Sequence, residues 1–419
     1  MMPIFEISSV SRMKILFVIL SLTVTYNACL YAQSGKFISV KGKELIGPDG
    51  KNFLIRGTNL GNWLVPEGYM FKFNKTTSPR LINQAFRELI GPDEADQFWR
   101  KYLDSYVTGA DIHYLKSLGM NSIRVPFNYR LFTNEPYLGG HGEARAFSLL
   151  DKLVGWCKKE NLYIILDMHC APGGQTGDNI DDSYGYPFLF DSKESQQLVV
   201  SIWRDIANHY KNETIIIGYD LLNEPIATYF DAGHFNPLLE PLYKRIVSAI
   251  RQVDPNHIVF LGGAQWDSNF KIFGRPFDNK AVYTFHKYWT ATTQDVIQEY
   301  IDFRDKYNVP IYCGETGENE DDWVMNFRIL LEKNNIGWHY WPYKKMTNTK
   351  GIVTFNKPEG YDEIIAFADS TKSGFEDIRK MRPKNTDQVK KALERFLENC
   401  QFKNCTPNSS YISALELGK

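Results

Sequence analysis

The sequence of 419 residues predicts an α/β protein, a (β/α)8 TIM barrel preceded by a short N-terminal β-hairpin. Three observations lead to this fold. Between residues 53 and 341, short apolar and β-branched runs alternate with longer amphipathic runs, as in repeated βα units. The short runs number eight, which is the number of parallel strands that closes a barrel. No GxGxxG turn follows the first run, which disfavours an open dinucleotide-binding sheet.

The expected strands are spaced so that a helix fits between most neighbours. They cover residues 53–58, 122–126, 163–168, 215–222, 257–262, 281–285, 310–314 and 337–341. Amphipathic runs predict helices over residues 111–118, 149–159, 194–210, 237–253 and 294–307. Turn residues end several of these helices, as in Leu118-Gly119 and Val253-Asp254-Pro255.

Shorter segments flank the barrel. Residues 37–53 contain the turn sequence Gly47-Pro48-Asp49-Gly50 between strand-like runs, which predicts a hairpin that caps the barrel floor. After the last strand, a loop over residues 343–360 precedes expected helices at 361–369 and 387–399. We therefore expect one domain over residues 33–400 and a polar, mobile C-terminal tail over residues 401–419.

The first 32 residues are typical of a secretory signal peptide. Lys14 precedes an apolar run over residues 15–24, and the small residues Ala28 and Ala32 follow it; Met13 is an alternative start. At about 1.5 Å per residue the run is too short to span about 30 Å of hydrocarbon. We expect export to an extracellular or periplasmic space, with no membrane span after signal removal, and lipid anchoring at Cys29 is the alternative.

Composition excludes several classes of protein. The formal net charge is -1, so the basic footprint of a nucleic-acid binder is missing, and 43% hydrophobic residues exclude a wholly disordered chain. No CxxC pair and no HExxH motif occurs, so we predict neither a metal site nor a cofactor. The sequence leaves open whether Cys400 and Cys405 are bridged. We expect a monomer.

Polar or stacking side chains follow most of the expected strands at their C-terminal ends, where the loops of a barrel converge on one mouth. They are Arg124, His169, Asn223 with Glu224, His286 with Tyr288, Glu315 and Trp341. Each alone has a structural explanation, because a lone Glu after a strand is often a helix cap and a lone His is often a core side chain. Together, on six of eight strands, they predict an active site.

Glu224 and Glu315 follow the fourth and seventh strands and would face each other across the mouth. A glycosidase needs such a pair, because one carboxyl protonates the leaving oxygen while the other attacks, or activates water at, the sugar carbon. Trp341 is placed to stack on the apolar face of a pyranose. Glu318 and Glu320 are weaker candidates for the nucleophile, since they lie beyond the strand in a loop.

At these residues the sequence resembles glycoside hydrolase family 5, the cellulase-like retaining enzymes built on a (β/α)8 barrel. The resemblance runs from about Gly57 to Trp341. It rests, in the family's order, on Arg124-Val125-Pro126, His169 with Pro172-Gly173, Asn223-Glu224-Pro225, His286-Lys287-Tyr288, Gly314-Glu315 and Trp341.

The resemblance implies a double displacement through a covalent glycosyl-enzyme, with Glu224 as acid/base and Glu315 as nucleophile. It implies that Arg124 and Tyr288 hold Glu315. Asn223 would then bond the sugar 2-hydroxyl, and His169 and His286 would line the subsite around the scissile bond.

Residues 59–67 and 169–177 are similar to the exo-acting β-1,3-glucanase branch of the family, in which Glu67 falls at a sugar-binding acid. Pro66, Gly68-Tyr69 and the long loop 178–190 depart from that branch. Five aromatic side chains are expected at the mouth to bind substrate: Trp63, Tyr69, Tyr288, Trp289 and Trp341.

We therefore expect a secreted, retaining β-glycoside hydrolase that acts on a β-glucan-type polysaccharide or oligosaccharide. The alternatives are a β-mannanase or cellulase of the same family, a transglycosylase, and a carbohydrate-binding barrel without catalysis. The glucan linkage and the choice between exo and endo action stay open at this stage.

Overall fold

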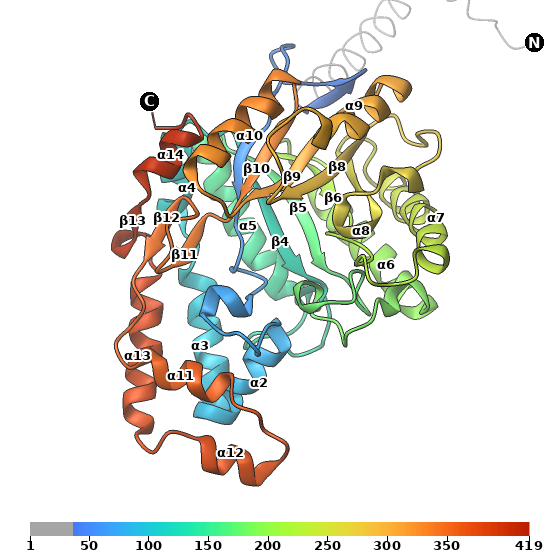
Figure 1. Ribbon diagram of the computed structural model, residues 1–419. Helices are drawn as coiled ribbons and strands as arrows, with labels where there is room; N and C mark the ends of the chain where they lie inside the picture. The colour runs from blue at the N-terminus through green and yellow to red at the C-terminus, as the bar shows by residue number, and fades with distance from the viewer. Residues whose placement is uncertain (1–36, 419) are drawn as a thin grey trace, which may run out of the picture.

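A closed parallel barrel forms the centre of the computed structural model, which describes residues 37–418 (Figure 1). Its strands are β3 (Arg56–Asn59), β4 (Ser122–Asn128), β5 (Tyr163–Cys170), β6 (Ile216–Asp220), β7 (Ile258–Gly262), β8 (Ala281–Tyr288), β9 (Ile311–Gly317) and β10 (Gly337–Trp341). Each strand pairs with the next, and β10 closes the barrel on β3. The predicted TIM barrel is confirmed; the predicted signal peptide and Cys29 lie outside the described residues.

The helices that surround the barrel begin and end where the sequence supplies caps. They are α4 (Gly109–Ser117), α5 (Glu143–Glu160), α6 (Lys193–Tyr210), α7 (Ala232–Arg251), α9 (Asp295–Tyr307) and α10 (Asp321–Lys333). Thr108 and Asp111 form a capping box at the start of α4. Asn161 and Asn308 end α5 and α9 in the left-handed conformation, which asparagine tolerates. No helix within residues 37–418 is long and apolar enough to span a bilayer.

A hairpin of β1 (Ser39–Lys41) and β2 (Glu44–Ile46) covers the N-terminal end of the barrel, as predicted. Its Ile38 and Leu45 pack in one apolar cluster with barrel side chains such as Ile217 and Phe260. The two strands join at Gly42, however, and not at residues 47–50. The segment 47–50 forms a second tight turn, in which the Gly50 N–H donates to the Gly47 carbonyl at 2.9 Å.

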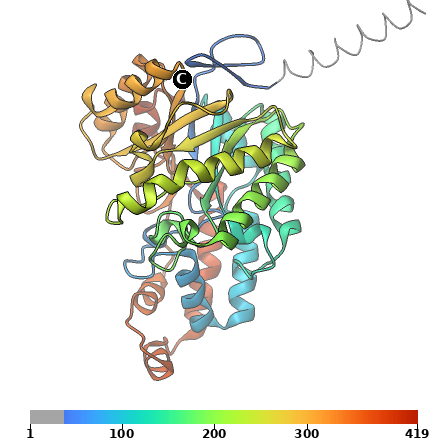
Figure 2. The ribbon, with the colours of Figure 1, turned by 90° about the vertical axis from the view of Figure 1, so that its right-hand side faces the viewer.

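A helical lobe covers the opposite end of the barrel, as Figures 1 and 2 both show. It consists of α2 (Pro79–Ile90), α3 (Pro92–Ser105), α11 (Tyr361–Ala368), α12 (Phe375–Met381) and α13 (Thr386–Asn399). Its core is aromatic: Phe71 stacks on Phe396, with ring centroids 5.1 Å apart, and Phe86 stacks on Trp99 at 5.3 Å. Much of the 14% aromatic content is therefore used for packing and not for binding sugar.

The segment after residue 400 is not the free polar tail that we expected. β13 (Thr406–Pro407) joins β11 (Lys344–Met346) and β12 (Val353–Phe355) in a small sheet, and α14 (Ser409–Ala414) packs against α10. Tyr411, Ile412 and Leu415 are buried there. These few apolar residues anchor the segment, although polar residues dominate its composition. Cys400 and Cys405 are both free thiols.

Candidate active site

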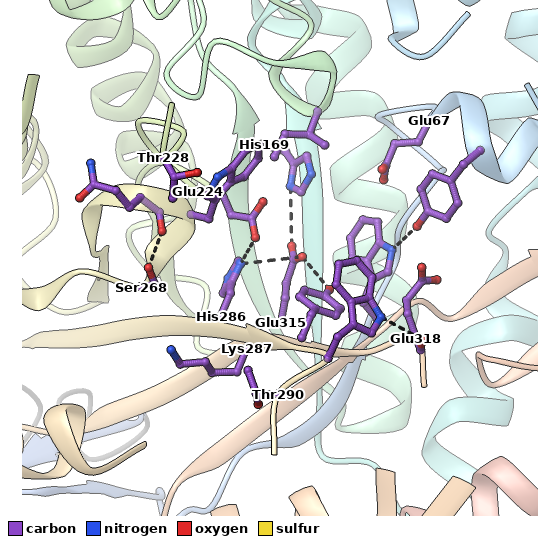
Figure 3. Close-up of a pocket in the computed structure, with 17 residues that line it drawn as sticks. Glu67, His169, Glu224, Thr228, Ser268, His286, Lys287, Thr290, Glu315 and Glu318 are labelled. Atoms are coloured by element: carbon purple, nitrogen blue, oxygen red, sulfur yellow. Dashed lines mark hydrogen bonds and ion pairs between the residues drawn. The ribbon is translucent and has the colours of Figure 1, made fainter. Parts of the chain in front are cut away.

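The loops at the C-terminal ends of the barrel strands enclose a cavity of about 760 Å³ (Figure 3). The predicted residues that line it are Glu67, Tyr69, His169, Glu224, His286, Tyr288, Trp289, Glu315 and Trp341. Glu318, which was a weaker candidate for the nucleophile, and Lys287, which belongs to the motif His286-Lys287-Tyr288, also line it. The lining that we did not predict is Ile180, Thr228, Gln265, Trp266, Ser268 and Thr290. Most of these residues lie on loops beyond the strands. In a loop, the amino-acid sequence alone does not indicate whether a side chain points into the cavity. Arg124, Asn223 and Trp63 were predicted at the site but do not line the cavity.

Glu224, just after β6, and Glu315, in β9, face each other with His286 between them (Figure 3). The Nδ1 of His286 lies 2.9 Å from Glu224 Oε1 and 3.9 Å from Glu315 Oε2. One oxygen of each carboxylate and one ring nitrogen lie within 4.8 Å of one another. Retaining glycosidases hold their carboxyl groups about 5–5.5 Å apart, whereas inverting enzymes need about 6.5–9.5 Å to admit a water. The pair therefore has the spacing of a retaining site.

Glu315 is held by two donors. Arg124 Nη1 lies 2.5 Å from Glu315 Oε1, and the Tyr288 hydroxyl donates to Oε2 at 3.0 Å. Arg124 is fully buried and also pairs with Asp220 at 2.8 Å and Asp167 at 3.1 Å. A cation and a hydroxyl thus orient the carboxylate that has to attack as an anion.

The histidines of the site are neutral at physiological pH. Burial lowers the pKa of His169 to about 4 and that of His286 to about 3. His169 Nδ1 lies 2.9 Å from Asp167, and its ring stacks on Trp341 with centroids 5.7 Å apart. The two rings therefore form a rigid, uncharged wall beside the carboxylate pair.

Two predicted substrate contacts lie elsewhere. The Nε1 of Trp63 donates to the Leu103 carbonyl at 2.8 Å, and the ring is buried against the helical lobe, whose helices α2 and α3 we had not predicted. The prediction that Trp63 lies at the mouth is therefore wrong. Asn223 is fully buried and accepts from Arg124 at 2.9 Å, with Nδ2 3.4 Å from His169. Its contact with a sugar 2-hydroxyl stays a prediction.

Comparison with known proteins agrees with this geometry. The sequence profile of the cellulase family, glycosyl hydrolase family 5, matches residues 88–347. The chain belongs to glycoside hydrolase family 5. A β-xylosidase from Phanerodontia chrysosporium is 34% identical over 366 residues, which cover 78% of this chain and 74% of that protein. The predicted family and the predicted glycoside hydrolase activity are confirmed.

More distant relatives of the glycosidase are named for activities other than that of a β-xylosidase. Endoglucanase C from Acetivibrio thermocellus is 28% identical over 311 residues, 59% of this chain and 87% of the relative. Glucan 1,3-beta-glucosidase 2 from Wickerhamomyces anomalus is 29% identical over 255 residues, 57% of each protein. The family thus fixes the class of reaction and leaves the substrate to the details of the cavity.

One side of the glycosidase cavity ends in a wall. Lys345 pairs with Glu318 and lies 5.1 Å from the centroid of the Tyr69 ring, and Trp341 donates to the Tyr69 hydroxyl at 2.7 Å. Glu67 lies against this wall and is 4% exposed. Its Oε1 has no hydrogen-bond partner within residues 37–418, and burial together with Glu315 raises the pKa of Glu67 well above its usual value.

We expect kcat/KM of the glycosidase to fall above about pH 7. Burial raises the pKa of Glu224 to about 7, and the acid form is the one that protonates the leaving oxygen. Above that pH, each further unit leaves about tenfold less acid. The measurement is kcat/KM against pH on a substrate with an unactivated leaving group. The same alkaline decline in Glu224→Gln, followed on a dinitrophenyl glycoside, would assign it to another group.

Proposed function

We propose that the enzyme is an exported, exo-acting, retaining β-glycosidase that removes one sugar at a time from the non-reducing end of a β-glucan. The acid/base has to stand on the side of the leaving group, because it protonates the oxygen that departs. The leaving group then extends over Thr228 and Ser268, and the sugar to be released lies toward Glu67 and Glu318, on the other side of Glu315 (Figure 3).

The observation that carries this proposal is Glu67. It is a buried acid at the walled end of the cavity, with one oxygen that no described residue satisfies. A buried acceptor without a partner is costly, whereas a terminal sugar offers adjacent hydroxyls as donors. Tyr69 and Glu318 line this side of the cavity and are linked through Lys345. We infer that they limit the space for a further sugar beyond the terminal one. This arrangement supports removal of single terminal sugars.

β-Xylosidase activity is the second candidate, because the relative that is 34% identical carries that name. Hydrolysis of 4-nitrophenyl β-glucoside and of 4-nitrophenyl β-xyloside, compared by kcat/KM, separates the two. Transfer to an added sugar acceptor, in place of hydrolysis, would identify a transglycosylase.

The central test is product sizing at early times on laminarin, pustulan, cellulose, barley glucan and mannan. The exo mechanism requires monosaccharide as the first product, and proton NMR should show it as the β-anomer before mutarotation. A ladder of oligosaccharides with a rapid loss of viscosity would refute exo action. An α-anomer as the first product would refute the retaining mechanism.

Glu67→Met should lower kcat/KM by about 10–100-fold without lowering Tm. A buried polar group that loses its hydrogen-bond partner costs about 1–3 kcal/mol, and the substitution would leave the hydroxyls of the terminal sugar without theirs. Stability should not suffer, because the lost carboxylate oxygen has no partner in the free enzyme. Glu320→Gln is the control, since Glu320 is exposed and pairs with Lys350 at 2.7 Å outside the cavity. Equal losses in both variants would contradict the role of Glu67.

A further inference from the structure

The turn after β7, labelled α8 (Ala264–Asp267) in Figure 1, is not a regular helix. Three consecutive non-glycine residues are left-handed: Gln265 at φ 51°, Trp266 at φ 62° and Asp267 at φ 57°. Each such residue costs about 1–2 kcal/mol, and such strain persists only where the surroundings enforce it. Here the Gln265 amide donates to Asn236 at 2.8 Å, and the Asn269 N–H donates to the Ala264 carbonyl at 2.8 Å.

The strained turn brings the Asp267 carboxylate beneath the acid/base. Its Oδ2 accepts from the backbone N–H of Glu224 at 3.0 Å and lies 3.4 Å from Nε2 of His286. The other ring nitrogen of His286 lies 2.9 Å from the Glu224 carboxylate. One oxygen therefore faces both the main chain of Glu224 and the ring that contacts its side chain. A side chain at Gly262 would displace it, because a Cβ there would lie 1.8 Å from Asp267 Oδ1.

Glu224 itself needs this support. Its own φ is 45°, a left-handed value that glutamate adopts only under constraint. On one side its carbonyl accepts from the Thr176 hydroxyl at 2.8 Å, and on the other its amide is held by Asp267. Without Asp267 the backbone could relax and carry the carboxyl away from the leaving oxygen, and proton transfer requires about 2.6–3.2 Å between heavy atoms.

We propose that Asp267 is a positioning residue for the acid/base, holding the main chain of Glu224 so that its carboxyl group protonates the leaving group. Asp267 is fully buried and does not line the cavity, so it acts through Glu224 and not on the substrate. This inference rests on one part of the proposed function, the assignment of Glu224 as the acid/base.

The test compares two leaving groups in Asp267→Ala. A 2,4-dinitrophenyl β-glycoside needs almost no acid assistance, whereas a methylumbelliferyl or disaccharide substrate of the same sugar needs it. kcat/KM should fall about 100-fold on the poorer leaving group and less than about fivefold on the dinitrophenyl glycoside, because acid catalysis contributes about 10²–10⁴-fold. Asp267→Asn, whose amide oxygen can still accept from Glu224, should recover most of the loss. Equal losses on both substrates in Asp267→Ala would overturn the proposal.

Asp254→Ala is the matched control. At the barrel floor, Asp254 also accepts a backbone N–H, that of His257 at 3.1 Å, and faces the ring of the same histidine at 2.5 Å. This variant should change Tm without changing the ratio of kcat/KM between the two substrates. If Asp267→Ala does not fold, Asp267→Ser repeats the test, because its hydroxyl is too short to reach the Glu224 amide. If the wild type hydrolyses no β-glycoside, the proposed function fails and the role of Asp267 fails with it, whereas equal losses in an active enzyme overturn only the role of Asp267.

Discussion

Replacing Glu315 by alanine should lower kcat/KM by at least about 10⁴-fold and leave the barrel folded. The variant retains acid catalysis but lacks the group that attacks the sugar carbon. Arg124 would still pair with Asp220 and Asp167, so no buried cation is left without a partner. The measurement is kcat/KM on the dinitrophenyl glycoside that the wild type hydrolyses, with circular dichroism to verify folding.

Azide distinguishes loss of the nucleophile from general damage. In Glu315→Ala the small anion can enter the vacated space, attack the sugar carbon and displace dinitrophenolate. It should restore turnover and give the α-glycosyl azide, because it approaches from the face that Glu315 used. Glu224→Ala should instead give the β-glycosyl azide, since azide then attacks the covalent intermediate.

Glu318→Ala is the control for this assignment. Glu318 lines the same cavity and pairs with Lys345, but it lies beyond β9, so it should not be essential. Full loss of activity in Glu318→Ala, together with retained activity in Glu315→Ala, would exchange their roles.

The positions of the catalytic carboxylates could be predicted because each follows an apolar run that has to be a barrel strand. Alternation of such runs with helices sets the order of the strands, and a closed barrel brings their C-terminal ends together. Glu224 and Glu315 meet at the mouth for that reason alone. The same logic located His169 and His286, which directly follow the predicted strand segments.

The failures have equally physical causes. Trp63 belongs to a loop whose direction depends on a lobe assembled from distant segments, and the pattern of one segment does not reveal that packing. The last residues bury Tyr411, Ile412 and Leu415 against the barrel helices, although their composition is polar. The role of Asp267 could not be predicted, because it depends on a left-handed turn at residues 265–267. Glycine is the residue that usually indicates such a turn in a sequence, and none of these three residues is glycine.

Arg124→Met should lower the free energy of unfolding by about 3–5 kcal/mol, which is the cost of leaving buried charges without their partner. The guanidinium is the shared partner of Asp167, Asp220 and Glu315, all of them buried. Activity should fall as well, since the carboxylate that attacks loses one of its two donors. Urea unfolding, with the slope compared between variant and wild type, measures the loss of stability.

The loss should depend on pH in a direction that follows from the two aspartates. Burial raises the pKa of both Asp167 and Asp220 to about 7, even though Arg124 opposes the shift. The pKa of each aspartate is higher in the folded state than in the unfolded chain, where it is about 3.9. The stability that these groups contribute is therefore greatest below about pH 3.9 and is lost as the pH rises through about 7. Without Arg124 both pKa values rise further, so the deficit should be larger at about pH 8 than at about pH 5.

Arg251→Met provides the contrast that isolates this mechanism. Arg251 pairs with Asp278 at 2.8 Å near the barrel floor, and hydrogen bonding to Arg251 overcomes burial and lowers the pKa of Asp278. The stability from that pair is present above the unfolded pKa and is lost only as pH falls through the folded one, below about 4. Its deficit should therefore be constant between about pH 5 and pH 8. A constant deficit in Arg124→Met as well would mean that Asp167 and Asp220 stay ionised in the fold between about pH 5 and pH 8, which would contradict the raised pKa values of the two aspartates.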